Sequence, residues 1–393
     1  MIEPMARADD SVSGDLHNGI VQTGKKVLVV SENFGTGHTK AAEALAKGLR
    51  SEHRGIEVQM VELGRELQPK VSRFLLSSYL NIIRKTPQVW KMLYGRHHTR
   101  SFPQWLQWCI YRTLYTRLAA YIEEIRPDLV VSTHPFASSG VARLKRQGLS
   151  TILCTLVTDF SAHGAWIHPE TDRYLVTHKG VRRQMVGMGV RPERILTTGI
   201  PTDRRFWKKQ NQREVRERMG LKQMSTLLIL GGGLGLGGTD RVVRAAAKWK
   251  EELQILVCTG YNRQLKESME RDGELRHPHI RITGFTTQMA DWMDAADLIV
   301  SKPGGMTCTE AIAKEKPLLI YGTIPGHEER NGQFMLEQGL AEKADDDDEL
   351  DCWFQRLVSG DLPLDRLRER MMVWRERIHP SHSVQAVLEM LTS

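Results

Sequence analysis

Cysteine and long apolar runs are scarce in this sequence of 393 residues. The five cysteines stand far apart, and none belongs to a Cys-x-x-Cys pair. This spacing excludes a disulfide framework and a cysteine metal cluster, and it is typical of a protein kept in a reducing cytoplasm. No apolar run approaches the roughly 18 to 20 residues that a membrane-spanning helix requires. We therefore expect a soluble or peripheral cytoplasmic protein.

The first residues of the chain also lack an apolar core. Residues 1–24 are polar, with three aspartates and several glycines and serines. This composition excludes a signal peptide or a membrane anchor and predicts a flexible tail. The remaining length is ample for two domains.

Acidic residues are absent between Glu66 and Glu123, although the whole chain has a net charge of only +8. Nine Lys and Arg residues are interleaved there with Trp, Tyr, Phe and Leu. This mixture is typical of a helix that lies on an anionic membrane, where each basic side chain contributes about 1 kcal/mol. A helical insertion with an aromatic core and a basic wet face is the alternative. Nucleic-acid binding is less favoured because no RNA- or DNA-binding motif accompanies the stretch. The candidate membrane residues are Arg84, Lys85, Trp90, Trp105 and Trp108.

Two strand–turn–helix units follow one another between Leu298 and Gln338. In the first unit, Pro303, Gly304 and Gly305 separate a buried strand from a helix, which is the arrangement that brings a phosphate to a helix N-terminus. In the second unit, Pro325 and Gly326 turn the chain before a polar helix. Two such units side by side predict a nucleotide crevice. The candidate ligand residues of the second unit are Pro325, Gly326, Glu328, Glu329 and Asn331, which otherwise form an ordinary acidic helix start.

Glu310 lies one turn into the first of these helices. Its carboxylate is placed to accept hydrogen bonds from a ribose diol, and a solvated helix glutamate is the plainer interpretation. An earlier strand, Thr226 to Leu230, runs into a loop with six glycines between 231 and 238. Gly232 and Gly233 would let backbone N–H groups approach a diphosphate. The loop lacks the Gly-Lys-Ser/Thr ending of a Walker motif.

The motifs SKPGGMTCTEAIA and PLLIYGTIPGHEERNG together resemble the donor-binding region of the monogalactosyldiacylglycerol synthase family. The chain is similar in particular to the bacterial processive diacylglycerol glucosyltransferases, and more distantly to the transferase that adds N-acetylglucosamine to the peptidoglycan lipid intermediate. The resemblance spans Val27 to about Leu340. It implies donor-binding roles for Ser301, Lys302, Gly304, Gly305, Met306 and Thr307, and a uracil contact for Phe285.

His38 stands where the first strand feeds the first helix, at the edge of the sheet that faces the ligand crevice in open α/β proteins. A lone histidine is usually a cap or a surface residue. The Gly-x-Gly-His loop that ends in Gly37 and His38, however, matches the position at which the family is thought to place its general base. An imidazole with a pKa near roughly 6.5 is suited to take the proton of an attacking alcohol.

Two further polar residues follow predicted strands and should face the same cleft. Asp159 is a candidate for orienting His38 or an acceptor hydroxyl, and His134 for contacting the acceptor; both also fit as simple loop caps. His163 and His168 have no matching second pair, so a zinc site is not expected.

The resemblance implies the GT-B fold, an α/β architecture of two Rossmann-like domains facing each other across a cleft. We expect an acceptor- and membrane-binding domain at 25–200, a UDP-sugar domain at 201–375, and a final helix at 376–393 that returns to the first domain. The implied reaction is inverting transfer of a hexose, glucose in preference to galactose, from a UDP-sugar to diacylglycerol on the cytoplasmic face of the membrane. No metal is expected, because helix N-termini would stabilise the leaving UDP.

Three other functions remain open from the sequence. A UDP-sugar epimerase could use the same two-domain frame, a glycosyltransferase could act on a soluble acceptor, and a non-catalytic protein could bind UDP-sugar or lipid as a sensor. The oligomeric state is not encoded in any of these patterns.

Overall fold

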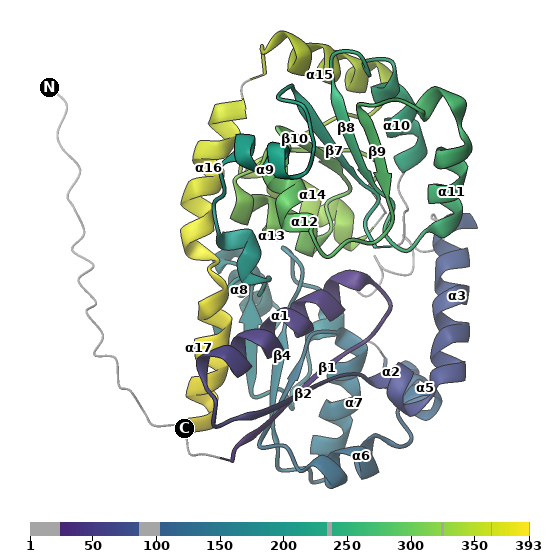
Figure 1. Ribbon diagram of the computed structural model, residues 1–393. Helices are drawn as coiled ribbons and strands as arrows, with labels where there is room; N and C mark the ends of the chain where they lie inside the picture. Colours follow the sequence, from purple (N-terminus) through teal and green to yellow (C-terminus); the bar gives the residue numbers. More distant parts are fainter. Residues whose placement is uncertain (1–23, 86–102, 234–237, 324–325, 363, 393) are drawn as a thin grey trace, which may run out of the picture.

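Two parallel six-stranded sheets form the centres of the two halves of the molecule (Figure 1). The computed structural model describes residues 24–85, 103–233, 238–323, 326–362 and 364–392. The first sheet has the order β2-β1-β3-β4-β5-β6 and the second β12-β11-β10-β7-β8-β9. The first sheet consists of β1 (Lys26–Ser31), β2 (Glu57–Glu62), β3 (Leu129–Ser132), β4 (Ile152–Leu156), β5 (Arg173–Val176) and β6 (Ile195–Thr197). The second consists of β7 (Thr226–Leu230), β8 (Gln254–Cys258), β9 (Ile280–Thr283), β10 (Leu298–Ser301), β11 (Leu318–Ile320) and β12 (Ala341–Lys343).

The inner strands are mostly apolar, as is typical when helices cover both faces of a parallel sheet. β3, β7, β8 and β10 are buried at every residue. The first half contains α1 (Thr36–Glu52), α2 (Leu63–Leu67), α3 (Pro69–Lys85), α5 (Gln104–Leu114), α6 (Leu118–Ile125), α7 (Pro135–Arg146) and α8 (Lys179–Gly187). The second contains α9 (Gln212–Arg218), α10 (Thr239–Ala247), α11 (Arg263–Arg271), α12 (Met289–Ala295), α13 (Gly305–Lys314), α14 (His327–Glu337), α15 (Asp347–Ser359) and α16 (Leu364–Arg377). This arrangement confirms the predicted α/β GT-B fold.

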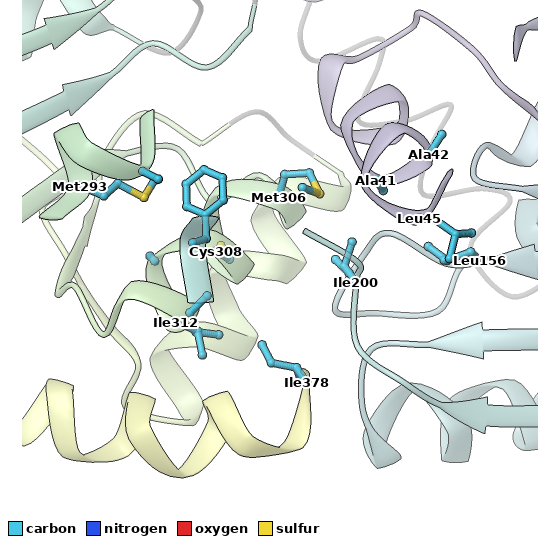
Figure 2. Close-up of a cluster of buried hydrophobic side chains, with 14 of the residues drawn as sticks. Ala41, Ala42, Leu45, Leu156, Ile200, Met293, Met306, Cys308, Ile312 and Ile378 are labelled. Atoms are coloured by element: carbon cyan, nitrogen blue, oxygen red, sulfur yellow. The ribbon is translucent and has the colours of Figure 1, made fainter. Parts of the chain in front are cut away.

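The two halves share one continuous cluster of buried apolar side chains. Figure 2 shows Ala41, Ala42 and Leu45 of α1 on one side and Met306, Cys308 and Ile312 of α13 on the other, with Ile200 between them. Met306 approaches Gly37 so closely that a Cβ on Gly37 would lie 3.5 Å from its Cγ. The contact between α1 and α13 therefore fixes how the two sheets face each other.

The end of the chain returns to the first half through α17 (Pro380–Thr392), which continues the line of α16 along one side of the molecule (yellow, Figure 1). Val384 packs against Gly48 of α1, and the Ser383 hydroxyl donates to the Gly199 carbonyl at 3.3 Å. The domain boundaries at 24, 200 and 375 stay a prediction. In the described parts of the chain, no helix is both long and apolar enough to cross a membrane.

Candidate functional site

A cavity of about 290 Å³ lies between α1 of the first half and the loops and helices of the second half. Its walls come from α1, from the 203–206 segment that joins the halves, and from the carboxyl ends of β7, β8 and β9. This is the edge at which open α/β sheets bind their ligands. Seven of the residues predicted from the sequence line it: Gly37, Gly232, Gly233, Phe285, Met306, Thr307 and Glu310.

His38 is placed one residue beyond Gly37, in the first turn of α1. Its Nδ1 lies 3.0 Å from the Thr133 carbonyl oxygen and 2.7 Å from the Thr158 hydroxyl. Because a carbonyl oxygen only accepts, Nδ1 carries the proton and Nε2 keeps its lone pair. Burial lowers the pKa of His38 to about 4, although the negative charge of Asp159 raises it in part. The imidazole is therefore neutral at neutral pH and able to accept a proton.

The two other polar residues predicted near His38 have structural partners of their own. His134 is the N-cap of α7, where its Nδ1 accepts from the Phe136 amide at 3.2 Å, and its ring meets that of His38 edge-on at 4.6 Å. Asp159 is buried, and its Oδ1 accepts from the Asn331 side chain at 3.2 Å. Burial lowers the pKa of His134 well below its usual value. Both residues thus shape the surroundings of His38 while capping or bridging local structure.

Asn331 was predicted to contact the nucleotide sugar, but it is not among the residues that line the cavity. The Oδ1 of this α14 residue accepts from the backbone N–H of Phe160 at 2.8 Å, and its amide donates to Asp159. Asn331 thus connects the second half of the molecule to the strand-end loop of the first.

The glycines at this edge allow the two halves to approach each other. A Cβ on Gly233 would lie 2.1 Å from the Thr36 hydroxyl oxygen, and one on Gly305 would lie 2.1 Å from the Thr158 carbonyl oxygen. Gly232 has φ +65°, a conformation that favours glycine. Gly304 is the N-cap of α13, and no side chain caps that end of the helix. The free N–H groups of this first turn form the kind of site that receives an anion.

Other residues predicted to bind the donor support the cavity from behind. Lys302 and Glu328 form a largely buried ion pair at 2.6 Å, and the Ser301 hydroxyl donates to the Leu230 carbonyl at 3.2 Å. Gly326 has φ +112° and precedes α14, and Glu329 lies in the first turn of that helix. None of these five residues is among those that line the cavity in the described part of the chain.

Glu310 projects into the cavity from α13. Burial raises the pKa of its carboxyl group to about 8, against the lowering effect of Lys40. At neutral pH the group is therefore protonated, with one oxygen that accepts and one hydroxyl that donates. A vicinal diol, which needs both functions, is a suitable partner for it.

An aromatic pair that the sequence analysis did not include borders the same cavity. Tyr261 stacks on Phe285 with ring centroids 4.7 Å apart and planes 8° from parallel, and both rings are exposed. The ammonium of Lys40 lies 5.1 Å from the Phe285 centroid. Tyr261 follows the carboxyl end of β8, so strand-end position was the signal that would have identified it. Lys40, Lys47, Asp203 and Arg205 also line the cavity and carried no motif.

The predicted membrane residues fall partly outside the described chain, as does Pro325. Trp90 lies in the undescribed 86–102 stretch, and Arg84 and Lys85 end α3 without described side chains. Trp105 and Trp108 of α5 are 67% and 49% exposed, and Phe74 of α3 is 69% exposed. Within the described residues, no group of three or more His, Cys, Asp or Glu side chains is arranged to hold a metal ion.

The two facing sheets with a cavity between them form the GT-B architecture, and solved structures share this fold. Acinetobacter baumannii MurG superposes with a TM-score of 0.57 at 17% identity over 93% of this chain and 99% of its own. Anabaena HepE, solved in complex with UDP-glucose, gives 0.58 at 13% identity with the same coverage.

The sequence comparisons define the family. Residues 38–202 match the family described as monogalactosyldiacylglycerol (MGDG) synthase, and residues 226–358 match the glycosyltransferase family 28 C-terminal domain. Relatives named processive diacylglycerol beta-glucosyltransferase, from Bacillus thuringiensis (strain Al Hakam) and Bacillus mycoides (strain KBAB4), are 28% identical over 93% and 92% of this chain and 93% of theirs. The first half of the chain thus matches the MGDG synthase family and the second half the glycosyltransferase family 28 C-terminal domain, which confirms the resemblance seen in its motifs.

Proposed function

We propose that this protein transfers a hexose from a UDP-sugar to the hydroxyl of diacylglycerol at a membrane surface, with inversion at the anomeric carbon. The observation that carries the proposal is the neutral imidazole of His38 beside a cavity bordered by the uncapped N-terminus of α13. The names of the relatives support diacylglycerol as the acceptor and favour glucose over galactose.

The reaction is a single displacement. Nε2 of His38 takes the proton of the acceptor hydroxyl as that oxygen bonds to the anomeric carbon of the sugar. The bond from the anomeric carbon to the UDP oxygen breaks at the same time, and UDP leaves with the electron pair. A base in this position contributes about 10²- to 10⁴-fold to the rate.

The leaving diphosphate accepts hydrogen bonds from backbone N–H groups in the first turn of α13 and in the Gly232–Gly233 loop. These dipoles are fixed before the reaction, so they stabilise the developing negative charge without reorganisation. Glu310 holds the ribose diol and Phe285 contacts the uracil. Ser301, Lys302, Gly326, Glu328 and Glu329 act from behind the cavity wall by fixing the turns that present these groups.

The basic aromatic helices α3 and α5 bring the protein to the membrane that contains the lipid acceptor. We infer that Phe74, Trp105 and Trp108 enter the interface of an anionic membrane, with the surrounding Lys and Arg residues at the headgroups. The protein then works as a peripheral enzyme on the cytoplasmic face. An epimerase has no use for such a surface, and both matched families are described as glycosyl-transferring.

The test is glycolipid formation from UDP-glucose or UDP-galactose and diacylglycerol in anionic liposomes. His38→Ala should lower kcat by about 10²- to 10⁴-fold while UDP still binds, because only the base is lost. His53→Ala, at the opposite end of α1, is the matched control. Full activity of His38→Ala would refute the assigned base. No product from the wild type with either donor would overturn the proposed reaction.

A further inference from the structure

A buried carboxyl group with no described cationic partner lies directly behind the loop that carries His38. Glu32 is the first residue after β1 and is completely buried. Its Oε1 accepts from the Tyr115 hydroxyl at 2.6 Å and from the Gly64 backbone N–H at 2.9 Å. Its Oε2 is buried without a hydrogen-bond partner among the residues that the structure describes.

The surroundings of Glu32 disfavour a negative charge. The apolar cluster around it includes Val30, Leu63 and Leu114. Burial raises the pKa of Glu32 to about 7, although the bonds from Tyr115 and Gly64 lower it in part. The nearby carboxylate of Glu62 adds to the rise; it accepts from the Thr39 hydroxyl at 2.7 Å and pairs with Arg65 at 3.7 Å.

Glu32 connects the helices of the basic aromatic stretch to the base-carrying loop. Tyr115 directly follows α5, and Gly64 belongs to α2. Gly64 also separates Glu32 from α3, since a Cβ built on it would lie 2.7 Å from Glu32 Oε2 and 3.0 Å from the Ser72 hydroxyl. The carboxyl group of Glu32 thus lies against or next to α2, α3 and α5, the helices that the structure describes between β2 and Tyr115.

On its other side, Glu32 begins the 32–35 loop, which leads into the first turn of α1, where His38 lies. Phe34 in this loop packs its ring 5.9 Å from that of His134 and 5.7 Å from that of Phe136. His134 in turn meets His38 at 4.6 Å. A shift of Glu32 therefore moves Phe34 and, through it, the rings around the proposed base.

We propose that Glu32, held by Tyr115, is a positioning residue that sets the 32–35 loop and the first turn of α1 against the membrane-facing helices and thereby controls sugar transfer to the acceptor. The inference rests on the proposed function, because it assigns Glu32 to the acceptor side of that reaction. The protonated carboxyl group keeps the contacts of Glu32 with Tyr115 and Gly64 intact, and so holds the loop against the helices. Ionisation adds a full negative charge to this apolar site, and the cost of burying that charge weakens the contacts between the loop and the helices.

The experiment measures glycolipid formation in anionic liposomes between pH 5.5 and 9 for the wild type, Glu32→Gln and Tyr115→Phe, with UDP-sugar saturating at every pH so that ionisation of Glu310 does not empty the donor site. The wild-type rate should fall about tenfold or more between pH 7 and pH 9, as the protonated fraction of a group with this pKa falls. Glu32→Gln cannot ionise, so its rate should stay level between pH 7 and pH 9. Tyr115→Phe removes the hydroxyl that stabilises the Glu32 carboxylate. The pKa of Glu32 should therefore rise, and the loss of rate should begin at a higher pH. KM for the UDP-sugar should stay within about twofold in both variants.

Matched controls are Glu57→Gln, a mostly exposed glutamate on β2, and Tyr121→Phe, whose hydroxyl accepts from Gln59 at the surface. Both should keep the wild-type profile. Thermal denaturation at pH 6 and pH 9 verifies folding of every variant. If wild type and Glu32→Gln show the same fall above pH 7, the inference is overturned and the proposed function stands. If the wild type makes no glycolipid at any pH, the proposed function fails, and the role of Glu32 in it fails too.

Discussion

Glu310 shows how a residue acquires its chemistry from its surroundings. On an exposed helix it would be an ordinary carboxylate, but burial in the cavity wall raises its pKa to about 8. Protonation gives it one donor and one acceptor instead of two acceptors. The sequence located this residue correctly at one turn into the helix, yet no sequence pattern encodes its protonation state, which depends on how α1 closes over it.

We predict that Glu310→Ala lowers the affinity for UDP-sugar about tenfold, because the hydrogen bonds to the ribose are worth on the order of 1 kcal/mol. Glu310→Gln should stay within about threefold of wild type, since an amide also offers one donor and one acceptor. Isothermal titration with UDP measures both. The exposed Glu251→Ala serves as the control. An equally large loss in Glu310→Gln would mean that the ionised form binds the ribose.

The roles of Gly233 and Gly305 were only half predictable. Their motifs indicated room for a diphosphate, and both border the proposed diphosphate site. The structure adds that each also accommodates the opposite half of the molecule, at Thr36 and Thr158. That second requirement arises from residues more than a hundred positions away, so no local pattern could show it.

At the scale of elements, the inner strands were predictable and two edge strands were not. β7 begins and ends where the sequence predicts, at Thr226 and Leu230, because it is a nearly continuous apolar run bounded by turns. β2 alternates between buried and exposed residues, and β12 has three residues of which two are exposed. Edge strands are covered on fewer sides, so their sequences carry a weaker apolar signal.

The α5 helix carries a prediction about membrane binding. Trp105→Ala with Trp108→Ala should weaken binding to anionic liposomes at least about tenfold, because each aromatic side chain that enters the interface contributes more than 1 kcal/mol. Cosedimentation measures the change. Met372→Ala, an exposed apolar residue on α16, is the control and should bind as wild type does. Unchanged binding of the double variant would place the interface elsewhere on the molecule.

At the scale of the whole molecule, a buried ion pair attaches the segment between the halves to the second one. Lys314 of α13 and Asp294 of α12 are 1% and 5% exposed, and Lys314 also donates to the Lys208 carbonyl at 2.8 Å. Arg375 of α16 donates to the carbonyl of Trp207, the residue directly before Lys208. Twenty positions separate the charged partners, and no local pattern in the sequence predicts their pairing.

We predict that Asp294→Ala lowers the free energy of unfolding by about 3–5 kcal/mol, because Lys314 is left as an unpaired buried charge. Glu270→Ala breaks the exposed Lys266 pair on α11 and should cost about 0–1 kcal/mol. Urea denaturation distinguishes the two. Replacing both Asp294 and Lys314 by apolar residues of similar volume should recover most of the loss. A small effect of Asp294→Ala would show that water reaches Lys314.

The contact between Gly199 and Ile378 has a mechanical consequence. The chain passes between the halves near each of these residues, and a Cβ on Gly199, whose φ is +78°, would lie 2.8 Å from the Ile378 Cα. The outgoing and returning chain therefore cross at nearly one point. Because both connections pass this point, replacing Gly199 by any larger residue would strain the outgoing and the returning chain at once.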